Sequence, residues 1–472
     1  MKIALVNTNR MQPPIAPIGL DYIASALQSA GHEVQLLDLC WEEDAVKAIA
    51  GFFEESEFSL VGMTLRNTDD CVFTSRQSFV EEFLDLVKTV RKNSAAPIVA
   101  GGVGFSTMPE QVLSLADVDY GVWGDGEFVM PELAQRLKRN ENDSDLPNLI
   151  LRRNGTWHRN PPAMRSLQDL PAMRREFVDN RRYFREGGQS GFETKRGCAG
   201  ACIYCADPVA KGKQARVRPP AAVVDEIEAL CEQGINCLHT CDGEFNMPPE
   251  HALAVCLEII RRGLGEKIRW YAYCSPMPFS RELAETMRRA GCAGIDFGAD
   301  SGSETMLRCL GRSFRPDDIL DAVRWSAEEG MAVMLDLLLG APGESRESIT
   351  QTVELMKRAD PDRVGVSLGV RVYPGTALEG KVTGGKDTDG LVGGSGPFDP
   401  LFFLEPGIEN DVFEWLHALI GDDRRFLFYD PSRPKQNYNY NDNGRLVEAI
   451  HQGHRGAYWD ILRRLAGEAK DG

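Results

Sequence analysis

The sequence predicts an α/β protein in three parts: a doubly wound parallel domain of the flavodoxin-like or Rossmann-like type, a partial (β/α)6 TIM-like barrel, and a small α-rich C-terminal tail. Two series of short apolar runs alternate with amphipathic stretches, which is typical of parallel sheets with crossover helices. A charged segment with several prolines separates the two series, and a glycine-rich stretch at 384–396 follows the second. We therefore expect domains at 1–140, 191–385 and 386–472, with a linker at 141–190.

The first series contains five apolar runs, each short enough for a buried strand, with helical patterns between them. Ligands of doubly wound sheets bind at the carboxyl ends of the strands, beside the switch in strand order. The expected strands are Ile3–Val6, Val34–Leu37, Leu60–Leu65, Pro97–Ala100 and Tyr120–Trp123, and the expected helices include Leu20–Ala30, Ala45–Phe53 and Phe79–Lys92.

The second series begins at Gly191 and contains six strand-like runs, too few for a closed eightfold barrel. In the tail, a helix is expected near Asp411–Ile420, and a polar aromatic run at 437–443 together with Tyr429 is a candidate to cap a cavity. The expected barrel strands are Gly191–Thr194, Cys237–Cys241, Arg269–Tyr273, Gly294–Gly298, Ala332–Leu338 and Arg363–Val370, with helices such as Ala221–Gln233, Pro249–Arg261 and Asp317–Glu329 between them.

The composition and charge of the chain exclude some classes of function and favour others. The formal charge of −17 argues against general binding of nucleic acid, because phosphates require a basic face. The arginines between Arg174 and Arg185 favour a solvated interdomain helix over a basic patch. No run reaches the roughly 18 apolar residues that span a bilayer, and the first residues resemble a strand more than a signal peptide, so we expect a cytoplasmic protein. In that compartment the 12 cysteines point to metal binding or catalysis.

Three cysteines, Cys198, Cys202 and Cys205, have a C-x3-C-x2-C spacing that predicts an iron–sulfur cluster. Such clusters normally take four thiolates, so a set of three leaves one iron open for chemistry. A zinc site is the alternative, but zinc prefers paired ligands and no second pair lies at a matching distance. One strand carries a further group, which we expect to pack inside the barrel: Cys237, His239 and Cys241.

The cysteine spacing, with Tyr204 before the third cysteine, resembles the radical S-adenosylmethionine (SAM) superfamily. The resemblance implies a [4Fe–4S] cluster whose open iron binds SAM, and cleavage of SAM to a 5′-deoxyadenosyl radical. Four later segments follow the family's order at the ends of expected strands. By resemblance they place Asp242, Gly243 and Glu244 at the SAM amino group, Asp300 and Ser301 at its ribose and carboxylate, Gly340 near the adenine, and Tyr373 in the turn after the last strand. Asp300 stands where the family usually has glutamate.

The first domain resembles the cobalamin-binding domain of the cobalamin-dependent radical SAM enzymes. Glycines just past an apolar strand let the backbone approach a bulky ligand, and a following helix presents N–H groups to a phosphate. A ligand-free flavodoxin-like domain fits the same pattern, and the D-x-H-x-x-G motif that supplies an axial histidine elsewhere is absent. The implied cobalamin-binding residues are Gly101, Gly102, Val103, Gly104, Phe105, Gly124, Asp125 and Glu127, with Arg66 and Asn67 at the edge of the cleft.

Arg66 has two interpretations, which the sequence leaves open. It lies beneath cobalt and disfavours a sixth ligand, or it pairs with Asp69 or Asp70 at the end of the strand.

The two resemblances together imply a methyltransferase. In the implied reaction, one SAM methylates reduced cobalamin and a second SAM is cleaved at the cluster. Its 5′-deoxyadenosyl radical takes hydrogen from an unactivated carbon or phosphorus centre of the substrate, and the substrate radical then takes the methyl group from cobalt. The implied partners are a small-molecule substrate and an external electron donor of the flavodoxin or ferredoxin type. The alternatives are a cobalamin-dependent rearrangement or cyclisation and a non-catalytic corrinoid-binding protein. A methylthiotransferase normally needs three further N-terminal cysteines, and only Cys40 and Cys71 precede the motif.

Overall fold

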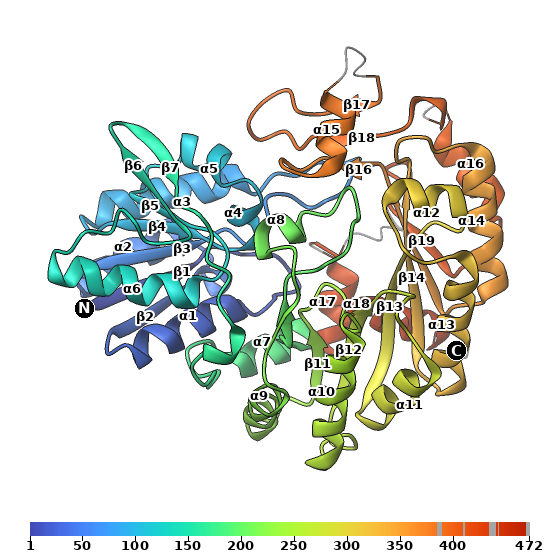
Figure 1. Cartoon of the computed structure of the whole chain (residues 1–472), viewed down its shortest axis with the longest axis horizontal. Coiled ribbons are helices and arrows are strands. Elements are labelled where there is room, and N and C mark those ends of the chain that lie inside the picture. Colours follow the sequence, from blue (N-terminus) through green and yellow to red (C-terminus); the bar gives the residue numbers. More distant parts are fainter. Residues whose placement is uncertain (385–388, 409–410, 434–439, 442, 469–472) are drawn as a thin grey trace.

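Two seven-stranded sheets form the framework of the chain, one in the N-terminal part and one in the barrel (Figure 1). The computed structural model describes residues 1–384, 389–408, 411–433, 440–441 and 443–468. No helix in these ranges is both long and apolar enough to cross a membrane.

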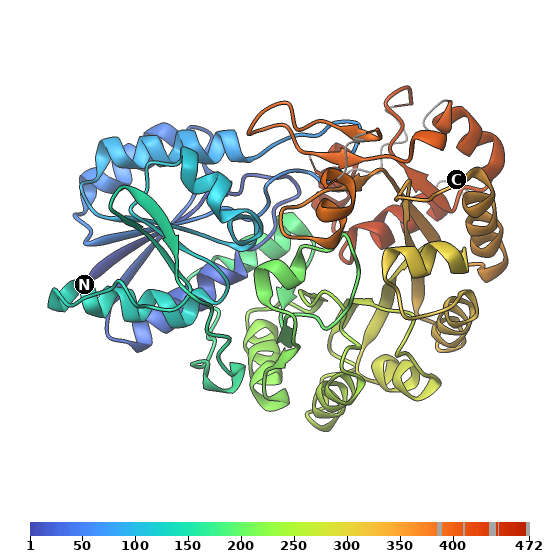
Figure 2. The ribbon, with the colours of Figure 1, turned by 45° about the horizontal axis from the view of Figure 1, so that its top comes forward.

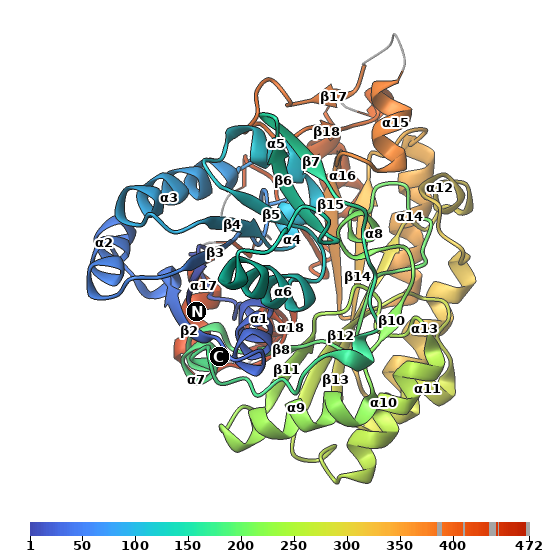
Figure 3. The same cartoon turned by 60° about the vertical axis from the view of Figure 1, so that its left-hand side comes forward.

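The first sheet begins with five parallel strands in the order β2-β1-β3-β4-β5, which confirms the flavodoxin-like prediction. Alternate residues of its strands enter two separate cores, since Ile3 and Leu5 pack on one face and Ala4 and Val6 on the other. Helices cover both faces (Figure 3). The strands are β1 (Lys2–Asn7), β2 (Glu33–Asp38), β3 (Leu60–Thr64), β4 (Ile98–Gly101) and β5 (Tyr120–Val122), with α1 (Ile18–Ser29) and α6 (Gly126–Arg139) on one face and α2 (Ala45–Glu55) and α3 (Val80–Asn93) on the other.

The range expected to be a linker adds two strands to this sheet. β6 (Leu149–Arg153) pairs antiparallel with β5, and β7 (Thr156–Arg159) pairs antiparallel with β6. A tight turn joins them at Asn154 and Gly155, whose φ angles are 50° and 81°. The prediction was wrong for this hairpin because its exposed arginines give the segment the charged composition of a linker. Only after it does the chain run through irregular structure to α7 (Asn180–Gly187).

The barrel contains the six expected strands, all parallel, and a seventh that the sequence did not reveal. The seventh, β19 (Phe426–Phe428), comes from the tail and pairs with β15, so the sheet stays open between β8 and β19. Helices surround its outer face (Figure 2). The other strands are β8 (Ser190–Phe192), β11 (Cys237–Thr240), β12 (Arg269–Cys274), β13 (Cys292–Asp300), β14 (Ala332–Leu339) and β15 (Arg363–Leu368), and the helices are α9 (Pro220–Glu232), α10 (Pro249–Arg261), α11 (Arg281–Arg289), α13 (Pro316–Glu328) and α14 (Arg346–Ala359).

The tail closes the inner side of the barrel. Trp459, in α18 (Tyr458–Glu468), packs against the inward-facing side chains of Cys237, Tyr271 and Met334. Tyr271 also donates a hydrogen bond to Asp460 over 2.7 Å. The remaining tail elements are α16 (Val412–Ile420) and α17 (Gly444–His451). A small sheet joins β16 (Val370–Arg371), at the end of the barrel range, to β17 (Leu391–Val392) and β18 (Phe402–Phe403) of the tail, and α15 (Ala377–Thr383) lies between β16 and β17 in the chain.

A buried ion cluster joins the first domain to the barrel. Arg175 lies 3.2 Å from Asp21 of α1 and 2.8 Å from Glu226 of α9. Glu226 also accepts hydrogen bonds from Tyr22 and from Arg218, both over 2.7 Å. The expectation of a solvated arginine helix was therefore wrong for Arg175, which is 1% exposed and precedes α7.

Replacing Arg175 with methionine removes one of the two arginine cations of this cluster and leaves the Asp21 carboxylate buried without its ion pair. Breaking a buried ion pair in this way costs about 3–5 kcal/mol. We expect Arg175→Met to lower the free energy of unfolding by that amount in denaturant titrations. The control is Arg308→Met, because the Arg308 side chain is 69% exposed and pairs with Glu304 only across one helical turn. Equal stabilities of the two variants would contradict a structural role for the cluster.

Candidate cofactor and substrate site

The three motif cysteines lie on a loop that the barrel holds in place. Asp242, just past β11, fixes the start of this loop with both of its carboxylate oxygens. Its Oδ1 accepts hydrogen bonds from the backbone N–H groups of Thr194 and Lys195, and its Oδ2 accepts one from the Thr194 hydroxyl over 2.6 Å. Gly197 has a φ of 78°, and a Cβ there would lie 2.4 Å from the Gln214 carbonyl. Asp242, expected at the SAM amino group, therefore positions the cysteine loop.

The three thiols fit a multi-iron cluster. A Cβ placed on Gly200 would lie 3.3 Å from the Cys198 sulfur and 3.7 Å from the Cys202 sulfur, so both sulfurs flank the same glycine. The pKa of Cys205 is raised to about 12, mainly by burial, with smaller contributions from the charge of Asp207 and from the other two thiols. Iron supplies the positive charge that such a set of thiolates requires. Among the residues that the structure describes, no three histidine, cysteine or acidic side chains converge on one metal ion. In a cubane, by contrast, each thiolate binds a different iron.

A polar network lies beside the cysteines. Arg312 contacts Asp300 at 2.5 Å and Glu244 at 3.3 Å, and the Tyr204 hydroxyl donates to Asp300 over 2.6 Å. Burial raises the pKa of Glu244 to about 7, an effect that Arg312 partly offsets. The network thus places one cation and two carboxyl groups where they influence Cys202. Sequence reasoning identified Tyr204, Glu244 and Asp300 but missed Arg312, which belongs to no segment of the resemblance.

The other expected SAM residues have different surroundings. Ser301 is fully buried, and its hydroxyl contacts Thr352 and accepts from the Ser303 N–H, so it stabilises the turn after β13. Gly340 has a φ of 92° and packs against Leu404. The Tyr373 hydroxyl lies 3.1 Å from the Cys71 sulfur, at the contact between the barrel and the first domain. Gly243 lines the larger cavity described below.

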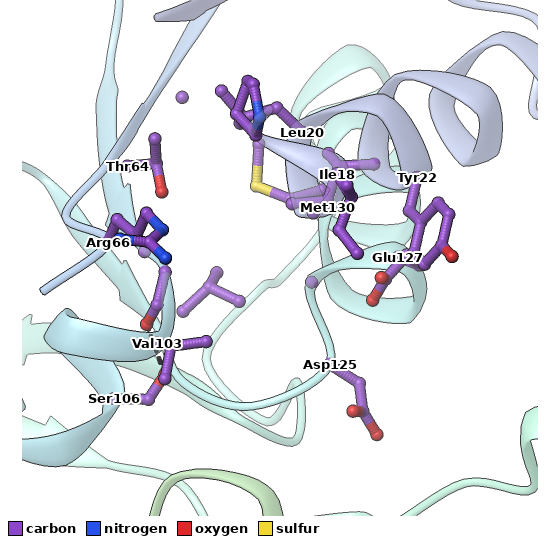
Figure 4. A pocket seen from close by; sticks show the side chains of 18 of the residues that line it. Ile18, Leu20, Tyr22, Thr64, Arg66, Val103, Ser106, Asp125, Glu127 and Met130 are labelled. Atoms are coloured by element: carbon purple, nitrogen blue, oxygen red, sulfur yellow. Dashed lines mark hydrogen bonds between the residues drawn. The ribbon is translucent and has the colours of Figure 1, made fainter. Parts of the chain in front are cut away.

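The carboxyl ends of the first sheet enclose a cavity of about 300 Å³, which we call the sheet-end cavity. It lies beside the switch in strand order between β1 and β3 (Figure 4). Expected cobalamin residues that line it are Arg66, Gly101, Gly102, Val103, Gly124, Asp125 and Glu127.

The glycines after β4 serve the fold as well as the cavity. A Cβ on Gly102 would lie 2.5 Å from the Leu65 carbonyl oxygen, and one on Gly104 would lie 2.8 Å from the Asn67 backbone. The Gly104 N–H donates to the Arg66 carbonyl, and the Phe105 side chain is wholly buried. Gly104 and Phe105 therefore pack the loop against the chain after β3, and neither is among the residues that line the sheet-end cavity.

Asp125 and Glu127 also hold the two domains together. Arg196, two residues before Cys198, lies 3.1 Å from Asp125 and 2.6 Å from Glu127. Arg216 forms a second pair with Asp125. Both carboxylates line the sheet-end cavity, but their charges are already compensated by the barrel.

Arg66 pairs with neither of its expected partners. Asp69 instead lies 2.8 Å from Arg371, and Asp70 accepts from Ser75. In the described part of the chain Arg66 forms no ion pair, and its guanidinium lies 3.9 Å from the Met11 sulfur. Burial lowers its pKa. Asn67 lies beside it and lines a second cavity.

The second cavity, about 710 Å³, lies between the barrel strands, the first domain and the tail, and we call it the barrel cavity. Arg66, Lys211 and Cys241 line both cavities, so the two adjoin. Among the residues expected to cap it, Tyr429, Tyr440 and Asn441 do line it, while 437–439 and 442 lie outside the described residues. The sequence gave no signal for several further lining residues: Lys211, Tyr273, Asp296, Asp336 and Trp459.

Comparison with known proteins agrees with this architecture. The family model of the B12 binding domain matches residues 5–134, and that of the radical SAM superfamily matches residues 192–356. A tryptophan 2-C-methyltransferase from Streptomyces laurentii is 34% identical over 435 residues, covering 79% of this chain and 73% of that enzyme.

Solved structures of the radical SAM methyltransferase TsrM from Kitasatospora setae superpose on the whole chain. With tryptophan and a SAM analogue bound, the TM-score is 0.92 at 30% identity, covering 100% of this chain and 99% of that one. With cobalamin and a [4Fe–4S] cluster bound, it is 0.90 at 29% identity, covering 100% of both chains. The chain described here belongs to the cobalamin-dependent radical SAM methyltransferases.

Proposed function

We propose that this enzyme C-methylates a tryptophan-like, indole-bearing small molecule, with SAM as the methyl source and cobalamin as the carrier. The observation that carries the proposal is that the sheet-end cavity and the barrel cavity adjoin at Arg66, Lys211 and Cys241. Cofactor and substrate held in the two cavities are thereby brought together, and such positioning supplies much of an enzyme's rate. The relative from S. laurentii acts on tryptophan, and TsrM binds it.

The residues divide between the cofactors as follows. Cys198, Cys202 and Cys205 hold the [4Fe–4S] cluster, and the Arg312–Asp300 pair binds the charged groups of SAM beside it. The loop Gly101–Val103 and Arg66 receive cobalamin in the sheet-end cavity. When bound, these groups supply methyl transfer through cobalt and the one-electron chemistry of the cluster. The proposal includes an external electron donor of the flavodoxin or ferredoxin type.

Arg66 is suited to a position beside cobalt. It is a partly buried cation without an ion pair among the described residues, and guanidinium has no lone pair to offer a metal. We therefore favour the first of its two interpretations: with cobalamin bound in the sheet-end cavity, Arg66 would lie against cobalt and disfavour a sixth ligand.

The barrel cavity favours a flat aromatic substrate. Aromatic side chains line it from the barrel strands and from the tail, among them Tyr273, Phe428, Tyr458 and Trp459. His239 belongs to the same wall, and burial lowers its pKa to about 4, so it is neutral at physiological pH. An apolar aromatic wall of this kind also excludes water from the reacting groups.

The first test is the reaction itself. We expect anaerobically reconstituted enzyme, supplied with SAM, cobalamin, L-tryptophan and a chemical reductant in place of the electron donor, to form a tryptophan derivative heavier by one methylene, with equimolar S-adenosylhomocysteine. Mass spectrometry and liquid chromatography measure both products. Consumption of SAM without a methylated indole compound would contradict the proposed substrate.

The second test concerns the cluster. We expect Cys202→Ala to lose iron, acid-labile sulfide and methyl transfer, because two thiolates hold a cubane poorly. Cobalamin binding, followed by its visible absorbance, should persist because its residues lie in the other domain. The matched control is Cys309→Ala, which replaces an exposed cysteine of α12 (Glu304–Leu310). This variant should keep the cluster, methyl transfer and cobalamin binding. Methyl transfer by the Cys202 variant at the wild-type rate would sink the cluster assignment.

A further inference from the structure

The inside of the barrel carries two acidic side chains that the proposed cofactor sites do not use. Along the strands, outward residues such as Ile295 and Phe297 enter the main core, so Asp296 between them points inward. Asp336 does the same on β14, between Leu335 and Leu337. Both carboxyl groups line the barrel cavity.

Asp296 and Asp336 are joined by a side-chain hydrogen bond, and Asp296 is only 3% exposed. Burial, and next the neighbouring Asp336, raise the pKa of Asp296 well above its ordinary value, so the pair retains a proton that two separate carboxylates would lose. Asp296 forms no ion pair with any described residue, and its Oδ1 atom has no hydrogen-bond partner among them. Burying such a group uncompensated is costly, which suggests that a ligand completes it.

Two other groups in the same cavity also lack partners. The Trp459 indole N–H and the Thr240 hydroxyl are each more than nine-tenths buried and make no hydrogen bond within the described chain. Both residues line the barrel cavity. Three elements, β11, β13 and α18, thus bring unsatisfied polar atoms to one cavity, as expected of a site built for a polar ligand.

The surroundings of the acid pair favour a cation. Tyr273 is paired in register with Asp296, is 43% exposed, and has its ring 4.8 Å from that of His239. Electron-rich ring faces attract cations, as carboxylates do. The basic side chains that line the cavity, Arg66 and Lys211, come from the end of β3 and from α8 (Asp207–Lys211). The acid pair therefore lies on the barrel strands, whereas the basic side chains come from the side of the cavity where the barrel meets the first domain.

We infer that Asp296 and Asp336 bind the ammonium group of the substrate, which makes a protonated amine a requirement for recognition. The inference rests on the proposed function and extends it from an indole-bearing molecule to an indole-bearing amine such as an α-amino acid. An ammonium group offers three N–H donors and a positive charge, and it takes the place of the shared proton. Asp296 and Asp336 are then specificity-determining residues that do not touch the cofactors.

The test compares L-tryptophan with 3-(indol-3-yl)propionate, which has the same skeleton and carboxylate but no amine. We expect the holoenzyme to bind tryptophan at least about 30-fold more tightly, because leaving a buried charged group without its partner costs that much or more. In Asp296→Asn and in Asp336→Asn this preference should fall below about 3-fold, with indolepropionate affinity unchanged. Calorimetry measures the dissociation constants, and Asp321→Asn, an exposed site on α13, is the matched control.

The outcomes separate this inference from the proposed reaction. Tryptophan preference retained in both variants, or loss of affinity for both ligands alike, would overturn the ammonium site. Methylation of indolepropionate as fast as tryptophan would overturn it too, while leaving the reaction standing. If binding depends on the amine and the variants abolish that dependence, but no methylation is observed, the ammonium site is supported and the proposed methyl transfer is overturned.

Discussion

Buried guanidinium–carboxylate contacts between the two sheets are the constraint on which the rest of the structure depends. Arg196 reaches from the strand before the cysteine loop to Asp125 and Glu127 at the carboxyl end of the first sheet. Arg175 connects the first domain to α9 in the same way. Because a buried charge is tolerated only with its partner, each contact fixes the position of one sheet relative to the other. Both cavities lie at this fixed contact, so their adjacency follows from the ion pairs.

The two faces of the parallel barrel strands have different roles. The outward residues form the main core with the surrounding helices, whereas inward residues such as Tyr273 and Asp296 line the barrel cavity. At the carboxyl ends of the strands, Asp242 holds the cysteine loop and Asp300 contacts Arg312. The tail then closes the space from inside with Trp459. A substrate would therefore contact the barrel, the first domain and the tail at once.

The sequence was a good guide wherever the signal is local. Apolar runs predicted the five parallel strands of the first sheet and six strands of the barrel, since a buried parallel strand is apolar on both faces. The cysteine spacing is equally local, and the cysteine loop occupies the end of the barrel where such sites lie.

What the sequence missed depends on contacts between distant segments. The strand β19 is three residues long and is defined only by its pairing with β15. Arg175 resembles its solvated neighbours in sequence, and its burial comes from Asp21 and Glu226, which lie in other parts of the chain. Ser301 and Phe105 stand in recognisable segments but point into the core. Asp296 and Asp336 become a pair only when β13 and β14 align.

The central claim is that one contact between the two sheets holds both metal centres. Anomalous diffraction from crystals of the reconstituted enzyme, recorded at the iron and cobalt absorption edges, tests it most directly. We expect iron density among the sulfurs of Cys198, Cys202 and Cys205, and cobalt density at the carboxyl end of the first sheet beside Arg66. Cobalt bound away from that end of the sheet, or iron elsewhere than at these three sulfurs, would contradict it.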